Sequence, residues 1–177
     1  HAAATVLLLR EVDGELEVLM MRRGSGLSFM AGMWVFPGGR VDAADASAAA
    51  GRRLAPADAT AVRDRLQTPE GDPLPAERER ALRVAACRET FEEAGVLLAH
   101  DAQGRPCPAG RLAGLQSLRG PVAGDAAAFV AMLEREDLYL DVDRLVYWSH
   151  WITPSLEPKR FDTRFFAIAL PPGQAVS

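Results

Sequence analysis

The alternation of apolar and polar residues along the chain predicts a mixture of strands and helices. Residues 5–10 are rich in leucine and β-branched residues, which is typical of a strand. Asp13-Gly14 is a hairpin-type dipeptide, so we expect residues 16–22 to return as a second strand. The same reasoning predicts further short strands at 34–36, 96–99, 145–153 and 164–170.

Helical signals are clearest at 76–94, where Gly95 follows as a C-terminal cap. Asp125 has the side chain of an N-cap and predicts a helix that ends near residue 135. Two shorter helices are expected at 43–54 and 58–66, in a segment rich in Ala, Asp, Arg and Pro. The mixed pattern of strands and helices indicates an α/β (α+β) fold.

Three carboxylates gather near the end of the longest predicted helix. Because residues three and four apart share a helix face, Glu89 faces both Glu92 and Glu93, and Arg88 reaches Glu92. Like charges at this density are costly unless a cation compensates them. Oxygen ligands suit Mg²⁺ or Mn²⁺, ions that also bind phosphate oxygens. The cluster therefore indicates a divalent-metal site for phosphate chemistry, with a solvated acidic helix face as the alternative.

A glycine turn precedes the acidic cluster by about fifty positions, at Phe36-Pro37-Gly38-Gly39. Proline fixes one backbone dihedral, and two glycines let the backbone approach a ligand closely. Such a turn can aim a carbonyl oxygen at a cation; a plain tight turn is the alternative.

Two stretches together resemble the two halves of a Nudix box: the glycine turn and the later Arg88-Glu89-x-x-Glu92-Glu93-x-Gly95-Val96. Counting from Gly39, the intervening acid falls on Asp45, where Glu is usual. The arginine then comes roughly 35 residues later than usual, which places a long helical insertion at 46–77. A box divided in this way resembles the expanded-box branch of the family, which includes coenzyme A diphosphatases.

This resemblance implies a Nudix fold, a mixed β-sheet between helices in a single domain spanning 1–177. It implies Mg²⁺ or Mn²⁺ bound by the Gly38 carbonyl and by Glu89, Glu92 and Glu93. In the family the first glutamate serves either as ligand or as general base, and both roles stay open for Glu89. Arg88 would hold a glutamate in place.

Two further stretches resemble the coenzyme A branch. Before the turn, Arg23, Gly24 and Gly32 fall at matching spacings, but Ser28 stands where a second arginine is expected. Near the end, Pro158-Lys159-Arg160-Phe161-Asp162-Thr163 is also typical of the branch. The substrate-binding residues implied are Arg23, Gly39 and Arg160, with weaker claims for Lys159 and Arg164.

The composition limits the classes of binding partner that we expect. The net charge of −4 argues against a nucleic-acid groove or an anionic membrane surface, and no apolar run reaches the roughly 20 residues of a membrane span. Cys87 and Cys107 are too few for a disulfide framework or a zinc cluster, which fits a reducing cytoplasm. His100 followed by Asp101 is expected to be a surface pair rather than a catalytic dyad.

The family fold also includes a later strand and a C-terminal helix that the sequence pattern does not show. We expect that the chain continues past Ser177 or that another chain, as in a homodimer, completes the layer. An additional acidic ligand from that region cannot be named.

Three functions are consistent with these residues. The first is a diphosphatase that acts on coenzyme A or an acyl derivative. The second is the same chemistry on ADP-ribose or a dinucleotide, which Ser28 favours. The third is a non-catalytic Nudix module that binds a nucleotide-like ligand or a protein partner; the complete set of clustered carboxylates argues against it.

Overall fold

The computed structural model describes residues 1–24, 32–55 and 66–176. Almost all of the helix expected at 58–66 lies outside the described residues, and so does Ser28. Among the described helices, none combines the length and the apolar composition that a membrane span requires.

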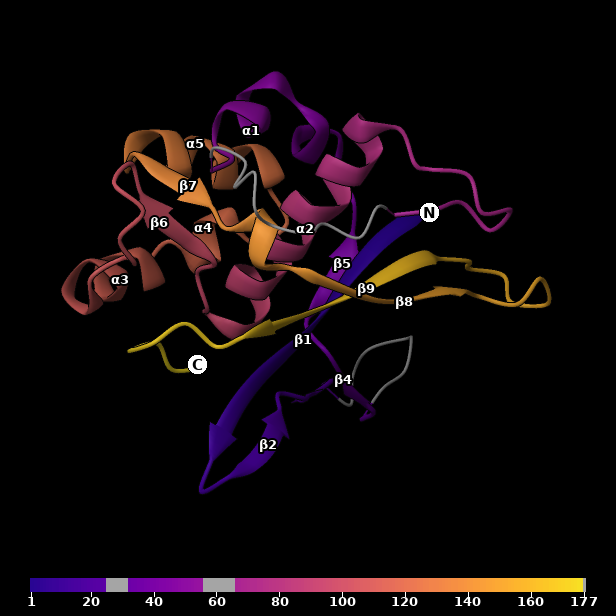
Figure 1. Cartoon of the computed structure of the whole chain (residues 1–177), viewed down its shortest axis with the longest axis horizontal. Helices are drawn as coiled ribbons and strands as arrows, with labels where there is room; N and C mark the ends of the chain where they lie inside the picture. The colour runs from indigo at the N-terminus through magenta and orange to yellow at the C-terminus, as the bar shows by residue number, and fades with distance from the viewer. Residues whose placement is uncertain (25–31, 56–65, 177) are drawn as a thin grey trace.

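The centre of the fold is a five-stranded mixed sheet with the order β2-β1-β9-β8, in which β5 also pairs with β1 (Figure 1). β1 runs parallel to β9, and all other pairs are antiparallel. The strands are β1 Ala2–Val12, β2 Glu15–Val18, β5 Gly38–Arg40, β8 Val146–Ile152 and β9 Asp162–Ala169. The predicted mixed sheet is confirmed.

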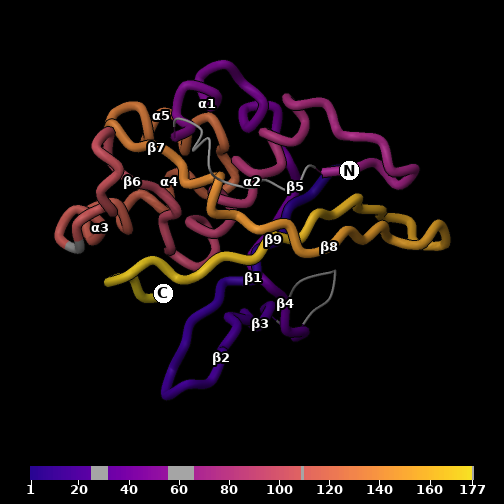
Figure 2. Tube along the Cα trace, viewed as in Figure 1, coloured from indigo at the N-terminus to yellow at the C-terminus, as the bar shows by residue number. Residues whose placement is uncertain are grey.

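One edge of β1 is shared by two partners. β5 lies beside its first half, where Thr5 is opposite Gly38, and β2 lies beside its second half, where Leu9 is opposite Val18 (Figure 2). Between them the chain leaves the sheet to form a small antiparallel pair, β3 Met21–Arg22 and β4 Trp34–Val35. The return strand predicted at 16–22 is therefore interrupted, although the turn at Asp13-Gly14 is as expected, with positive φ at both residues.

Figure 1 shows the described helices gathered over one face of this sheet; a covering layer on the other face is not found among the described residues. α2 Ala76–Ala94 packs against β1 and β5 and has the bounds that were predicted. Around it lie η1 Ala43–Ala46, α1 Ala48–Arg52, α3 Ala109–Gln116, α4 Arg119–Val122, α5 Ala126–Arg135 and η2 Val142–Arg144. The core between helices and sheet includes Val6, Leu8, Phe91, Phe129 and Phe166.

The strand predicted at 96–99 is wrong by three positions. β6 Ala99–Asp101 pairs instead with β7 Leu138–Leu140 in a separate two-stranded sheet. His100 Nε2 lies 3.2 Å from a carboxylate oxygen of Asp141, just after β7, so the side chain that faces His100 is that of Asp141 and not, as the predicted surface pair required, that of Asp101. With Asp101, the His100 ring makes a 2.7 Å contact to the backbone carbonyl.

The described part of the insertion packs on the domain. Leu66 and Leu74 are buried in the core, and the Gln67 carbonyl accepts a hydrogen bond from Arg164 of β9. Farther back, the backbone of Arg53 and Ala55 bonds to Leu140. These contacts hold η1 and α1 against the rest of the fold.

Candidate active site

The glycine turn and the acidic helix meet, as predicted. The amide of Gly38 donates a 2.8 Å hydrogen bond to Oε2 of Glu93. Val6 bonds to the Pro37 carbonyl and Val41 to the Ala2 carbonyl, so the alternation of an antiparallel ladder leaves the intervening Gly38 unbonded to β1. Both its amide and its carbonyl therefore point away from β1, on the side where Glu93 lies.

Gly39 lies directly against Glu89. A Cβ atom built at Gly39 would be 2.5 Å from Cδ and 2.7 Å from Oε2 of Glu89. Glycine is therefore the residue that allows the carboxylate to rest on this strand. The structure thus brings Gly38 and Gly39 to the two glutamates that lie at opposite ends of the cluster.

Arg88 organises the charged groups. Its Nε and Nη2 bond to the two oxygens of Asp45 at 3.0 and 3.1 Å, and Nη1 bonds to Glu89 at 2.9 Å and to Glu92 at 3.0 Å. Nη2 also donates to the carbonyl of Arg40, at the end of β5, at 2.9 Å. Because the Arg88 side chain is only 4% exposed, these contacts fix it in one orientation. This geometry agrees with the predicted role of Arg88, which is to hold a glutamate in place. Asp45, the acid found by counting from the glycine turn, had no predicted role and proves to be a further partner of Arg88.

Glu92 is held from two sides. One oxygen accepts from Arg88, and the other accepts from the backbone amide of Gly124 at 3.0 Å. The guanidinium of Arg119 bonds to the backbone carbonyls of Glu92 and Glu93, where a cation also offsets the negative end of the helix. The segment between α4 and α5 thus supports the acidic helix, a contribution that sequence reasoning missed.

The cluster carries more negative charge than its protein partners neutralise. Burial raises the pKa of Glu89 to about 7, against the charge of Arg88 and with added repulsion from Glu92. Burial alone would lower the pKa of Arg88, but Asp45 and Glu89 outweigh it and hold that pKa above its usual value. Three carboxylates therefore bond to one guanidinium, and Glu93 adds a fourth negative charge next to Glu92, an arrangement that an added cation would stabilise.

The charge of Arg23 also acts on the cluster. Partial removal from water raises the pKa of Glu93, and the Gly38 amide and the charge of Arg23 oppose that rise. Nε of Arg23 is buried without a hydrogen-bond partner among the described residues. Arg23 thus lies beside the site with donor capacity to spare.

The oxygen atoms of the cluster suit a hard cation, although the side chains are not arranged as a complete coordination shell. Among the described residues, no three His, Cys, Asp or Glu side chains converge as a metal-binding group. The oxygens of Glu92 are both taken by protein donors, whereas Glu89 and Glu93 each show one such bond. Oxygen-only ligands with excess negative charge fit Mg²⁺ or Mn²⁺, with Glu89, Glu93 and the Gly38 carbonyl best placed to contribute.

The remaining predicted substrate residues lie elsewhere. Arg160 is exposed, and its Nε donates a hydrogen bond to the Thr153 carbonyl. It comes just before β9, whose first residue is opposite Ala2, whereas Gly38 is opposite Thr5. Figure 1 shows the β8–β9 connection projecting away from the helices. Arg164 is 1% exposed and bonded to Asp162 and the Gln67 carbonyl, so the suggestion that it binds phosphate is wrong. Contact of Arg160 with a distant part of the substrate stays a prediction.

Comparison with known proteins gives consistent results. The family model for the NUDT19 Nudix domain matches residues 2–174. The chain is 36% identical to acyl-coenzyme A diphosphatase NUDT19 of Gallus gallus, covering 95% of this chain and 54% of that protein, and 36% identical to the Homo sapiens protein, covering 86% and 48%. A crystal structure of a Nudix hydrolase from Alicyclobacillus acidocaldarius matches with a TM-score of 0.68 and 31% identity over 99% of this chain and 71% of that one. The chain spans about half the length of the curated relatives that it matches.

Proposed function

Since the chain belongs to the Nudix hydrolase family, as its match to the NUDT19 Nudix domain shows, we propose that it hydrolyses the diphosphate bond of coenzyme A or an acyl-coenzyme A with the help of Mg²⁺ or Mn²⁺. The observation that carries the proposal is the meeting of Gly38 and Gly39 with Glu93 and Glu89 around a buried Arg88. The activity named for the relatives supports coenzyme A as the substrate class.

A bound divalent cation would neutralise phosphate charge and lower the pKa of a bound water. The residues that would hold it are Glu89, Glu93 and the Gly38 carbonyl, with Glu92 contributing directly or by fixing the helix. Arg88 keeps Glu89 and Glu92 in place through its 2.9 and 3.0 Å bonds. Arg23, whose charge acts on Glu93, would contact a phosphate oxygen.

Glu89 is suited to receive a proton in the reaction. Without a bound cation, burial raises the pKa of Glu89 to about 7, so this carboxyl holds a proton more readily than an exposed glutamate does. The oxygen of water forms a new bond to one phosphorus, the bridging P–O bond breaks, and the second phosphate departs with the bridging oxygen. The proton lost by the water passes to Glu89 or, if Glu89 serves only as a ligand, to solvent.

The direct test is a substrate panel with Mg²⁺, containing coenzyme A, octanoyl-coenzyme A, ADP-ribose, NADH and a diadenosine polyphosphate, with products identified by mass. The proposal expects cleavage of the coenzyme A diphosphate into an adenosine bisphosphate and a phosphopantetheine. Preferred cleavage of ADP-ribose or a dinucleotide would favour the second candidate. No cleavage of any compound would favour a non-catalytic module.

A matched pair of variants on α2 separates the site from the helix surface. Glu89→Gln removes a carboxylate from the cluster, whereas Glu77→Gln makes the same change at an exposed position in the first turn. We expect the first to abolish most cleavage and the second to leave it unchanged.

A further inference from the structure

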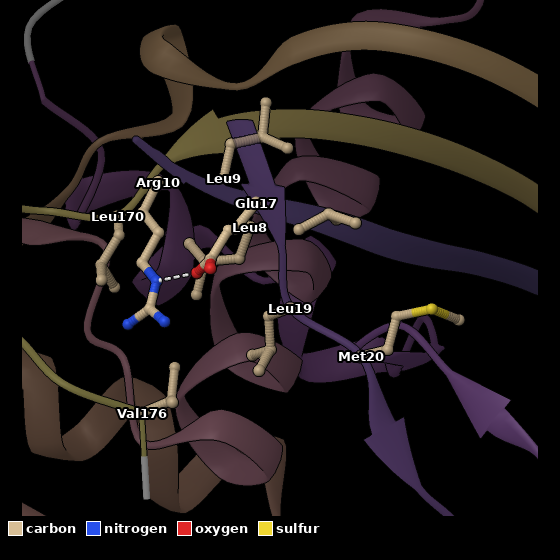
Figure 3. A pocket seen from close by; sticks show the side chains of 9 residues that line it. Leu8, Leu9, Arg10, Glu17, Leu19, Met20, Leu170 and Val176 are labelled. Carbon is tan, nitrogen blue, oxygen red and sulfur yellow. Dashed lines mark hydrogen bonds and ion pairs between the residues drawn. The ribbon is translucent and has the colours of Figure 1, made fainter. Parts of the chain in front are cut away.

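A cavity of about 210 Å³ opens beside the β1–β2 hairpin. Figure 3 shows the side chains of Leu8, Leu19, Leu170 and Val176 around it, drawn from three separate parts of the chain. Among the described residues that line it, the charged ones are Arg10 and Glu17, which bond to each other at 2.7 Å and so offset each other's charge. The cavity therefore offers apolar contact and no unpaired charge that would hold a polar group.

The wall formed by the end of the chain is fastened in place. The side-chain amide of Gln174 accepts a hydrogen bond from the Leu97 amide at 2.9 Å and donates one to the Leu97 carbonyl at 2.8 Å. The backbone of Leu170 also bonds to the carbonyl of Leu9 in β1. Leu170 and Val176, which flank Gln174, thus form a built side of the cavity.

The cavity lies one short strand length from the candidate active site. Val18, which lines it, is opposite Leu9, and Gly38, which contacts Glu93, is opposite Thr5 on the same edge of β1. Four residues of extended strand span about 13 Å.

A second route along the chain gives a similar distance between the cavity and the candidate active site. Met20 lines the cavity, and its neighbour Met21 is opposite Val35, which comes only three residues before Gly38. Those three residues span at most about 10 Å along an extended chain. Both distances are shorter than the extended pantetheine arm of coenzyme A, so the arm can reach from a diphosphate at the acidic cluster to the cavity.

We infer that this cavity binds the thioester end and the first acyl carbons of an acyl-coenzyme A whose diphosphate lies at the acidic cluster. The inference rests on the proposed function and adds a site for the acyl group. The apolar walls match an acyl chain, and 210 Å³ is room for several methylene groups. Longer chains would extend past the exposed side chains of Val18 and Met20.

The test uses acyl-pantetheines, which lack the diphosphate and cannot be cleaved at the active site. Binding of butyryl-, hexanoyl- and octanoyl-pantetheine is measured by calorimetry without metal. We expect affinity to rise by roughly fourfold for each methylene group that is buried, until the cavity is full. Affinity that is undetectable or independent of chain length would overturn the inference.

Variants locate the binding. Leu19→Gln places an amide in the wall, and Met20→Gln does so at a side chain that is 38% exposed, where folding is not at risk. Leu16→Gln is the matched control, because Leu16 lies on the same hairpin, is 72% exposed and does not line the cavity. We expect octanoyl-pantetheine to bind at least about fivefold more weakly to either cavity variant and normally to the control; equal binding by Met20→Gln and the control would contradict the assignment.

Cleavage assays separate this inference from the proposed function. Cleavage of free coenzyme A and octanoyl-coenzyme A with the same kcat/KM, unchanged in Met20→Gln, would reject the acyl site and keep the diphosphatase. Length-dependent binding without cleavage of any coenzyme A would keep the acyl site and reject the diphosphatase.

Discussion

Arg88 and Asp45 are joined by two hydrogen bonds of 3.0 and 3.1 Å, although 43 positions separate them in the chain. Asp45 is fully buried and also closes a capping box with Asp42 at the start of η1. The short helix that leads into the insertion is therefore fastened to the same arginine that holds Glu89 and Glu92. A shorter acid than the family's usual glutamate reaches Arg88 because η1 carries it there.

Removal of the Asp45 carboxylate should destabilise the protein strongly. Asp45→Ala leaves Nε of the buried Arg88 without its partner, although two glutamates still balance its charge, and an unsatisfied buried donor typically costs about 1–3 kcal/mol of unfolding free energy. Glu134→Ala breaks the exposed pair with Arg52 and should cost less than about 1 kcal/mol. Urea denaturation of both variants measures the difference; equal losses would show that the buried pair adds nothing special.

The two glycines of the turn should respond differently to alanine. At Gly39 the new Cβ meets the mobile end of Glu89, so Gly39→Ala should fold normally, displace the carboxylate and lower kcat by about 100-fold. At Gly38 it meets the backbone of Ala4 and Thr5, so Gly38→Ala should mainly lower the melting temperature. Gly114→Ala is the control, since nothing lies within 4 Å of its Cβ. Thermal unfolding and turnover are measured on all three variants. Full activity of Gly39→Ala would refute the distinction.

Glu92→Gln should reduce turnover while leaving the fold intact. Both oxygens of Glu92 accept hydrogen bonds, from Arg88 and from the Gly124 amide, and an amide side chain can keep only one of them. Loss of such a support typically lowers activity roughly 10–100-fold. Kinetics at saturating Mg²⁺ test this, with circular dichroism as the folding control. Unchanged kinetics would reject a role for Glu92.

Acid should weaken the contacts at the start of β9. Burial would raise the pKa of Asp162, but the hydrogen bond with His150 and the charge of Arg164 outweigh it and hold that pKa below 3.8. A lowered pKa in the folded state gives stability that is present above the unfolded value of about 3.9 and is lost as pH falls below it.

Asp162→Asn should therefore remove part of the loss of unfolding free energy between pH 5 and pH 3. Denaturation curves of the wild type and the variant at several pH values in this window provide the measurement. Parallel pH profiles for the two proteins would contradict the expected contribution of Asp162.

Local signals were sufficient to predict the helices that matter most. α2 ends at Gly95 because that residue adopts a left-handed conformation, with φ of 69°, and α5 begins after Asp125 because its carboxylate caps the Ala128 amide at 3.0 Å. Each of these helix ends is determined by a few adjacent residues. The spacing of Arg88 and Glu92 likewise predicted their contact, since it follows from helix geometry alone.

Contacts between distant residues explain the errors. The apolar run at 96–98 resembles a strand and is fully buried, but the Leu97 backbone is bonded by the side chain of Gln174 in place of a neighbouring strand. α3 and α4 were missed because Gly110, Gly114 and Gly120 disfavour helix locally. The support of Glu92 by Gly124 comes from a backbone amide, which has no signature in the sequence.

The central claim, that the glycine turn and the acidic helix together bind a divalent cation, is tested most directly by Mn²⁺ titration followed by electron paramagnetic resonance. Wild-type protein, Glu89→Gln, Glu93→Gln and the surface control Glu77→Gln would be compared without substrate. We predict that the wild type and Glu77→Gln bind Mn²⁺ with equal affinity and that each cluster variant binds at least about tenfold more weakly. Equal binding by all four proteins, or no binding by the wild type, would contradict the account.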